Sequence, residues 1–313
     1  MMSELQISIV IPVYASMDCL KTLAQRLKDV LNPLKRRYEI ILVNDCSPDK
    51  SWETILGLCQ ENPSIMGVNL RRNFGQHNAV MAGLQYASGE SIVIMDDDLQ
   101  HDPVHIPDLI HKLEKGYDVC YGRYTRKKHS WFKNFGSWFN DKVANIILKK
   151  PKDIYLSSFK ALKGDVAAEI LKYDGPYPYV DGLIFRVTRN ITQIDIVHHE
   201  RFSGKGNYTL GKSLNLWLKL ATNFSIFPLR IATFLGFLSS GIGFLLGLYY
   251  IILHLIGIQT PAGWSSLIVA VLFIGGIQLV SLGIIGEYVG RLFLHKSGEP
   301  QYTINQVIHH SNE

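Results

Sequence analysis

The chain has 313 residues, of which 47% are hydrophobic, and its formal net charge at pH 7 is +5. This length allows one sizeable soluble domain and a small membrane part. The charge suits an anionic substrate or lipid headgroups, but it is too small to indicate a nucleic-acid partner. The four cysteines form no CxxC pair, which favours free thiols in a reducing compartment. The first apolar run is short and follows Glu4, so we expect a strand there and no cleavable signal peptide.

The first half of the chain alternates short apolar runs with helical segments. Strands are expected at 7–13, 38–43, 65–70, 91–95 and 118–121, with less regular ones at 157–162 and 191–198. Helices are expected at 18–31, from Ser47-Pro48 onward, at 76–87 and at 105–115. Continuous apolar strands separated by helices predict a parallel sheet covered on both faces, with its ligand beyond the carboxyl ends of the strands. The absence of GxGxxG and GxxxxGKS sequences disfavours a dinucleotide oxidoreductase or a P-loop enzyme.

Three adjacent aspartates, Asp96, Asp97 and Asp98, follow the apolar run 91–95. Carboxylates at the end of a buried strand are costly unless a cation neutralises them. Hard oxygen ligands suit Mg²⁺ or Mn²⁺, and such ions usually bind substrate phosphates as well. A solvated acidic turn is the alternative. Asp45 ends an earlier strand, so it is expected to converge with the cluster on one site.

Two long segments near the carboxyl end are almost free of charge. Residues 231–257 contain no acidic or basic side chain apart from His254, and residues 265–286 contain none. At about 1.5 Å per residue, each is long enough to cross the roughly 30 Å hydrocarbon core of a bilayer. Arg230 before the first segment and Arg291 after the second predict a hairpin with both chain ends in the cytoplasm.

Residues 210–229 precede this hairpin and have helical amphipathicity. The same pattern fits a core-facing helix of the soluble domain, but the position directly before an apolar span favours a helix in the membrane interface. The expected organisation is thus a catalytic domain at 1–209, a juxtamembrane helix at 210–229, two transmembrane helices at 230–292 and a cytoplasmic tail at 293–313.

Several short sequences resemble a known family. They are Ile-Val-Ile-Pro-Val-Tyr (9–14), Val-Asn-Asp (43–45), Arg-Asn-Phe-Gly-Gln (72–76) and Asp-Asp-Asp-Leu-Gln (96–100). Together they resemble glycosyltransferase family 2, an α/β family with the Rossmann-like GT-A fold. The apolar hairpin and Gly-Ile-Ile-Gly-Glu-Tyr-Val-Gly-Arg (283–291) are similar to the polyprenyl-phosphate glycosyltransferases, the group of dolichyl-phosphate mannose synthase and the undecaprenyl-phosphate sugar transferases.

The resemblance implies roles for individual residues. Those expected at the nucleotide sugar are Pro12, Val13, Tyr14, Asp45, Arg72 and Asp96, although Arg72 is equally compatible with helix capping. Asp96 and Asp98 would be catalytic, and Asp98 would bind Mg²⁺ or Mn²⁺ with the help of Gln100. Most relatives have a small residue at the position of Asp97. Its carboxylate would either add to the metal site or point to solvent, and the second is favoured.

The acceptor in such enzymes is a lipid phosphate, which is largely ionised at pH 7 and needs cationic positioning more than a general base. The candidate cations are Arg123, Arg126, Arg201 and Lys205, and a solvated surface position is the alternative for each. Residues 201–208 resemble the family's Arg-x-x-Gly-x-Ser-x-Tyr loop, with glycine in place of the usual serine. Asp153 is a candidate base.

The predicted activity is inverting transfer of a sugar from a UDP or GDP sugar to a polyprenyl phosphate, at the cytoplasmic face of the inner membrane. The first alternative is a family 2 transferase with another glycan or lipid acceptor. The second is a catalytically silent membrane scaffold that retains the nucleotide-binding fold. Small-residue spacing in the apolar segments permits close helix packing, but it leaves the oligomeric state open.

Overall fold

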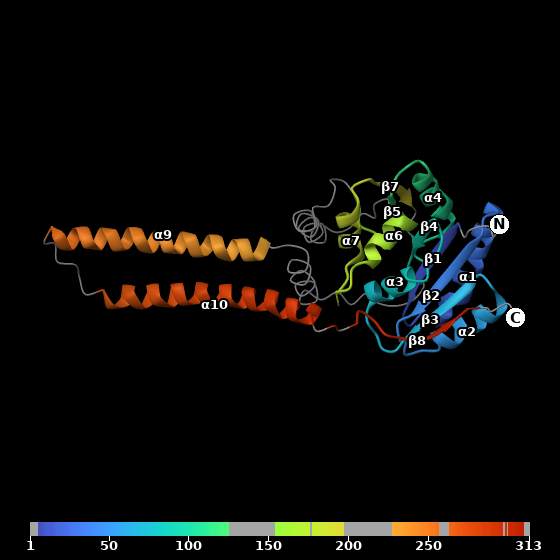
Figure 1. Cartoon of the computed structure of the whole chain (residues 1–313), viewed down its shortest axis with the longest axis horizontal. Coiled ribbons are helices and arrows are strands. Elements are labelled where there is room, and N and C mark those ends of the chain that lie inside the picture. Colours follow the sequence, from blue (N-terminus) through green and yellow to red (C-terminus); the bar gives the residue numbers. More distant parts are fainter. Residues whose placement is uncertain are drawn as a thin grey trace. The chain divides into compact units, whose positions relative to one another are not determined.

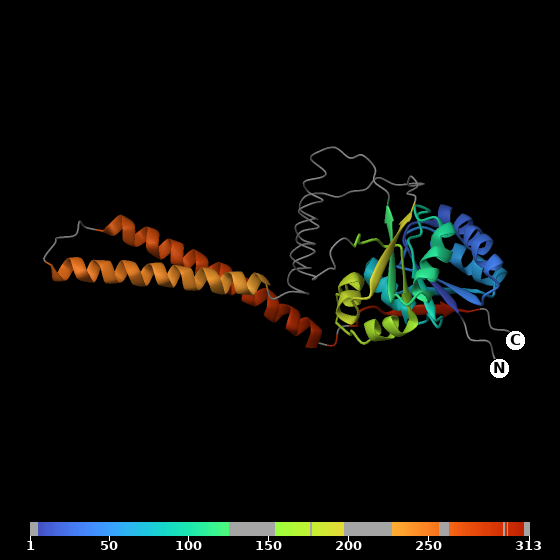
Figure 2. The same ribbon diagram turned by 90° about the horizontal axis from the view of Figure 1, so that it is seen from above.

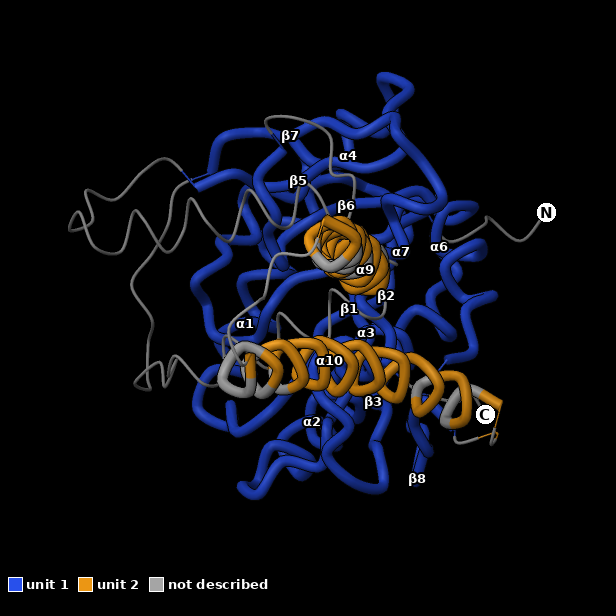
Figure 3. The backbone as a smooth tube through the Cα atoms, turned by 90° about the vertical axis from the view of Figure 1, so that its left-hand side faces the viewer, with its two compact units in different colours: residues 1–207, 299–313 blue, residues 208–298 orange. Residues whose placement is uncertain are grey.

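The computed structural model describes residues 6–124, 154–175, 177–196, 227–256, 263–296, 298 and 300–309. The chain divides into two compact units, one formed by residues 1–207 with 299–313 and the other by residues 208–298 (Figure 3).

In the described part of the first unit, eight strands form one sheet. They are β1 (Ile7–Val13), β2 (Tyr38–Asn44), β3 (Ile65–Leu70), β4 (Ser91–Ile94), β5 (Val119–Tyr124), β6 (Lys160–Lys163), β7 (Ile191–Ile196) and β8 (Ile304–Ile308). Their order across the sheet is β7-β5-β6-β4-β1-β2-β3-β8, and Figure 1 shows the part of this order from β4 to β8. The strands expected from apolar runs are confirmed, with ends that differ by a few residues.

The sheet is mixed rather than wholly parallel, so that part of the expectation is wrong. The central strands β4, β1, β2 and β3 are parallel, but β6 runs antiparallel to β4 and β5, and β8 runs antiparallel to β3. Every residue of β1 is buried, as the continuous apolar run of a doubly covered strand requires.

Helices cover both faces of the sheet (Figures 1 and 2). They are α1 (Met17–Leu31), α2 (Ser51–Glu61), α3 (Gln76–Leu84), α4 (Ile106–Glu114), α6 (Gly164–Leu171) and α7 (Val180–Val187). Side chains of α1, α2 and α4 join one apolar core with Ile9 and Ile11 of β1. On the other face, Gly83 lets α3 approach closely, since a Cβ there would lie 2.4 Å from Val10 Cγ1.

Two of these helices differ from expectation at their ends. Ser47 and Pro48 do not begin α2, which starts at Ser51 after Lys50. The Ser47 hydroxyl instead contacts the end of β1, where it accepts a hydrogen bond from the Ala15 amide at 3.2 Å. α3 ends at Leu84, three residues before the expected boundary.

The strand β8 follows the apolar helices and was not predicted. It pairs with β3 through Val68 opposite Val307 and Asn69 opposite Gln306. The Tyr302 hydroxyl also donates a hydrogen bond of 2.7 Å to Gln85. Residues 304–308 of the segment expected as a tail therefore form an edge strand of the sheet.

The second unit contains α9 (Phe227–Leu255) and α10 (Trp264–Lys296), which contact each other. Among the described residues, one segment, Phe273–Gly290, is long and apolar enough to cross a membrane, and Ala232–Leu246 is a shorter apolar stretch. Residues of the first segment are not buried inside the protein, unlike those of a soluble core helix. One of the two expected spans meets the criterion, and the two-span hairpin stays a prediction.

Candidate active site

Three loops meet at the carboxyl ends of β1, β2 and β4. The Tyr14 amide after β1 donates a hydrogen bond of 3.0 Å to Asp97 Oδ2 after β4. The amide of Asp45, just after β2, bonds to the Val13 carbonyl at 3.0 Å. The parallel arrangement of these strands thus brings the predicted acidic residues to one edge, as the sequence indicated.

Asp45 is buried and is bound by backbone amides. Its carboxylate accepts hydrogen bonds from the amides of Phe74 at 2.7 Å and Gly75 at 2.8 Å, immediately before α3. Burial raises the pKa of Asp45 above its ordinary value, although these two bonds oppose the shift. Gly75 precedes the first residue of α3 at φ 88°, a conformation that favours glycine. Asp45 therefore connects the loop after β2 to the Arg-Asn-Phe-Gly-Gln segment.

Asp96 is held from two sides. Gln76 Nε2 of α3 donates to Asp96 Oδ1 at 2.6 Å, and Ser158 Oγ, just before β6, donates to Asp96 Oδ2 at 2.6 Å. The Asp96 amide donates to Nδ1 of the buried His101 at 3.1 Å. The His101 ring stacks on Phe159 with a centroid distance of 5.1 Å. The bonds from Gln76 and Ser158 therefore orient both oxygens of the Asp96 carboxylate.

Asp97 does not point to solvent, so the favoured orientation is wrong. Its carboxylate accepts the Tyr14 amide and a hydrogen bond from the Ser16 side chain. Burial raises the pKa of Asp97 to about 6, and the neighbouring carboxylates of Asp96 and Asp98 add to the shift. Side chains alternate along an extended chain, which turns Asp97 toward the loop after β1.

Asp98 and Gln100 lie in a tight turn. The Gln100 amide donates to Asp98 Oδ1 at 3.1 Å, and the buried Leu99 between them has φ 60°. Within the described ranges, no group of three His, Cys, Asp or Glu side chains forms a preassembled metal cage. One carboxylate and one amide oxygen suit an Mg²⁺ or Mn²⁺ ion that takes its other ligands from water and a diphosphate. The donor set therefore fits the predicted metal only together with a substrate.

Backbone strain is concentrated at this edge. Among the described non-glycine residues, positive φ angles occur at Ala15, Lys35, Cys46 and Leu99. Three of them, Ala15, Cys46 and Leu99, lie in the loops after β1, β2 and β4 that carry the acidic residues. Such conformations cost about 1–3 kcal/mol each and cluster at functional sites, where the surrounding structure enforces them.

A buried charged cluster lies beside Asp96. Lys160 of β6 pairs with Asp181 of α7, and the Tyr121 hydroxyl donates to the same Asp181 oxygen at 2.8 Å. All three side chains are buried. Burial lowers the pKa of His77 of α3 to about 4. The charge of Lys160 adds to this shift, and the charge of Asp181 opposes it. The sequence signal for this cluster was weak, because lone charged residues are indistinguishable from surface positions without the fold.

Of the predicted cationic residues, Arg72 and Arg123 lie in the described part of the structure. The Arg72 guanidinium lies 4.6 Å from the centroid of the Phe74 ring. Arg123 forms a bidentate pair with Asp195 on the neighbouring strand, at 2.6 and 3.0 Å, so a phosphate would have to compete with a carboxylate for it. Arg126, Arg201, Lys205 and Asp153 lie outside the described residues, as does most of the expected helix at 210–229.

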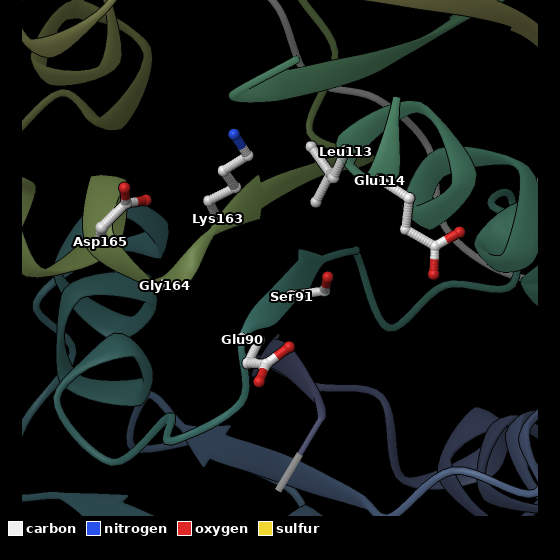
Figure 4. A pocket seen from close by; sticks show the side chains of 7 residues that line it. All are labelled: Glu90, Ser91, Leu113, Glu114, Lys163, Gly164 and Asp165. Carbon is white, nitrogen blue, oxygen red and sulfur yellow. The ribbon is translucent and has the colours of Figure 1, made fainter. Parts of the chain in front are cut away.

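The described structure also has a hollow away from the acidic cluster (Figure 4). Its lining residues are Glu90, Ser91, Leu113, Glu114, Lys163, Gly164 and Asp165. Ser91 begins β4 and Lys163 ends the antiparallel β6, which places the hollow at the opposite edge of the sheet. Side chains at that edge do not belong to the candidate site.

Comparisons to known proteins agree with the fold. A family model described as "Glycosyl transferase family 2" matches residues 8–170, and one described as "GtrB C-terminal hairpin" matches residues 227–292. The chain therefore belongs to glycosyl transferase family 2 and is a glycosyltransferase. The family assignment made from the short sequences is confirmed.

Curated relatives match nearly the whole chain. An uncharacterized glycosyltransferase, YkcC of Bacillus subtilis strain 168, is 36% identical over 98% of this chain and 95% of its own length. The undecaprenyl-phosphate 4-deoxy-4-formamido-L-arabinose transferase of Serratia proteamaculans strain 568 is 33% identical over 97% of this chain and 94% of its own. Among solved structures, glucosyl-3-phosphoglycerate synthase of Mycobacterium tuberculosis in complex with Mn²⁺, UDP and glucosyl-3-phosphoglycerate has a TM-score of 0.53 and 14% identity. The match covers 70% of this chain and 78% of that chain. That similarity supports the GT-A fold.

Proposed function

We propose that this glycosyltransferase moves a sugar from a nucleotide diphosphate sugar to undecaprenyl phosphate. The observation that carries the proposal is the presence, on one chain, of the three-loop acidic site and of a segment matched by the C-terminal hairpin family. Relatives that span the whole chain and are named undecaprenyl-phosphate sugar transferases support the acceptor class. The sugar itself is left open.

In this proposal, separate residues bind the nucleotide, the sugar and the acceptor. Pro12, Val13, Tyr14, Asp45 and Arg72 hold the nucleotide, and Asp96 contacts the ribose and the sugar. The lipid phosphate attacks the anomeric carbon with inversion, and because it is already ionised it needs orientation more than deprotonation. Arg123, Arg126, Arg201 and Lys205 orient the acceptor, and Asp153 is the candidate base.

Asp98 and Gln100 would hold Mg²⁺ or Mn²⁺. A divalent ion bound there would neutralise the departing nucleotide diphosphate. The Mn²⁺ and UDP named with the fold neighbour support a metal–diphosphate pair at this type of site. The positive φ of Leu99 supports this pairing, since it keeps Gln100 in a turn whose amide donates to Asp98.

The proposed location is the cytoplasmic face of the inner membrane. An interfacial helix at 210–229 and two spans within 230–292 would keep the catalytic domain, 1–209, at the headgroup layer. The exposed apolar surface of α10 supports insertion. A lipid phosphate then reaches the site without leaving the bilayer.

The first prediction concerns Asp98. Full-length wild type in membranes that contain undecaprenyl phosphate is expected to transfer sugar from one donor of a UDP- and GDP-sugar panel, and to lose activity with EDTA. Asp98→Asn is expected to reduce kcat/KM by at least about 100-fold, because it removes the metal carboxylate. Radiolabelled or mass-detected lipid product measures this.

Asp165→Asn, at the opposite edge of the sheet, is the matched control and should retain activity. Full activity in Asp98→Asn would refute the metal assignment. Transfer to a soluble glycan but not to the lipid phosphate would support the alternative acceptor, and no turnover of any donor would support the silent scaffold.

A further inference from the structure

Four consecutive backbone amides after β1 are bound by side chains. The amides of Tyr14 and Ala15 donate to Asp97 Oδ2 at 3.0 Å and Ser47 Oγ at 3.2 Å. The amides of Ser16 and Met17 donate to Ser51 Oγ at 3.2 Å and Asp49 Oδ2 at 3.1 Å. This loop is defined as residues 14–17, and its acceptors come from the segments after β2 and β4.

The bonded amides fix the shape of the loop. Ala15 has φ 54°, a conformation that costs free energy for a residue with a Cβ, so the loop needs external contacts to retain it. Asp97 is the contact from the acidic cluster, and it also receives the Ser16 side chain. Asp97 Oδ2 thus accepts a hydrogen bond from the loop, whereas Asp98 Oδ1 accepts one from the Gln100 amide.

We propose that Asp97 is a positioning residue, which holds loop 14–17 in the conformation that binds the nucleotide and takes no part in metal binding. The inference rests on the proposed function, because that function assigns Tyr14 to the nucleotide. It gives neighbouring carboxylates separate tasks: Asp97 acts through the loop, whereas Asp98 acts on the metal.

The test separates these tasks by measuring nucleotide and metal binding independently. Calorimetry on the detergent-solubilised full chain would titrate UDP and GDP in the presence of EDTA, and then Mn²⁺ in the presence of the nucleotide that binds. Asp97→Ala is expected to weaken the metal-free nucleotide affinity about tenfold, the order expected for a lost hydrogen bond to a charged acceptor. Its Mn²⁺ affinity at saturating nucleotide should stay within about twofold of wild type.

Three further variants make the result decisive. Asp97→Asn keeps a carbonyl oxygen for the Tyr14 amide and should restore most of the nucleotide affinity. Asp49→Ala releases the same loop at Met17, far from the acidic cluster in sequence, and should reproduce the Asp97→Ala defect. Asp98→Asn should show the reverse pattern, with metal affinity lost and metal-free nucleotide affinity retained.

Two outcomes would overturn the inference. One is an unchanged nucleotide affinity in both Asp97→Ala and Asp49→Ala. The other is a loss of Mn²⁺ affinity in Asp97→Asn that matches the loss in Asp98→Asn. If wild type bound neither UDP nor GDP, with or without Mn²⁺, the proposed function itself would fail, which is a result distinct from both.

Discussion

At the scale of single residues, adjacent side chains of the acidic cluster have different surroundings. Asp96 is bonded by Gln76 and Ser158, Asp97 by the loop after β1, and Asp98 by the Gln100 amide. Side chains alternate along an extended backbone, so Asp96 and Asp97 point in different directions. The positive φ of Leu99 accounts for the turn beside Asp98. Identical residue types thus acquire different roles through their neighbours.

His77 gives a pH-dependent prediction at this scale. Burial lowers its pKa to about 4, and the nearby Lys160 adds to this, whereas Asp181 and Asp96 oppose it. The unfolded chain therefore binds a proton between about pH 6.5 and pH 4 that the folded protein does not bind. The contribution of His77 to folding stability is fully present above pH 6.5 and is lost as pH falls, by at most about 3 kcal/mol at pH 4, whereas the raised pKa of Asp97 acts in the opposite direction.

Thermal unfolding of the full chain between pH 4 and pH 8 would measure this effect. His77→Gln removes the titrating group, so its melting temperature should fall less than that of wild type between pH 6.5 and pH 4. His111→Gln, an exposed position on α4, is the control and should follow wild type. Parallel curves for His77→Gln and wild type would contradict the prediction.

At the scale of secondary-structure elements, the Lys160–Asp181 pair joins β6 to α7 beside the site. Removing one partner of a buried pair leaves an uncompensated charge and typically costs about 3–5 kcal/mol. We therefore expect Lys160→Met to destabilise the first unit strongly, and Lys160→Met with Asp181→Leu to recover much of the loss. Denaturant or thermal unfolding of the full chain measures both.

The same strand offers a matched control. Lys163 pairs with Asp118 at 3.1 Å, but their side chains are 34% and 27% exposed. Lys163→Met should cost no more than about 1 kcal/mol, because solvent screens partly exposed pairs. Equal losses at Lys160 and Lys163 would show that burial of the first pair has no energetic consequence.

The strand β8 gives a second prediction about an element. Without it, the hydrogen-bonding groups along one edge of β3 would be unpaired, and exposed strand edges promote aggregation. A chain that ends before Ile304 should unfold at a lower temperature and aggregate in detergent, whereas a chain that ends at His309 should resemble wild type. Light scattering during heating would reveal a difference, and identical behaviour of the two truncations would refute a stabilising role.

At the scale of the whole molecule, a soluble-type fold and apolar helices share one chain. The first unit buries its apolar residues between sheet and helices, whereas α9 and α10 expose large apolar side chains such as Phe244 and Leu279. Apolar side chains on these surfaces suit a lipid environment. The backbone groups of the helices are already hydrogen-bonded within each helix, so they need no water there. The uneven distribution of charge along the sequence reflects these two environments.

The two-span topology can be tested by labelling. In a Cys46→Ser background, which removes the exposed native thiol, a cysteine at Thr260 should react with a membrane-impermeant maleimide added to the outside of intact cells. A cysteine at Ser311 should react only after lysis, because both chain ends are expected in the cytoplasm. Labelling of Ser311→Cys in intact cells would exclude a hairpin with both chain ends in the cytoplasm.

Sequence alone determined the family, the parallel centre of the sheet and the place of the acidic residues. Short apolar runs that alternate with helical segments favour buried parallel strands, and neighbouring parallel strands bring the loops at their carboxyl ends to one edge of the sheet. Contacts between segments far apart in the chain could not be predicted from the sequence. Ser158 reaches Asp96, Lys160 pairs with Asp181, and β8 joins β3 only in the folded chain.

Those contacts depended on tertiary structure for a physical reason. A hydrogen bond or ion pair depends on distance and orientation, and neither is encoded in the local residue pattern that periodicity and spacing report. Asp97 is an example. In the sequence it is one of three adjacent carboxylates, and only the fold shows that it accepts a hydrogen bond from the Tyr14 amide. Local chemistry determined which side chains were available, and packing decided which of them met.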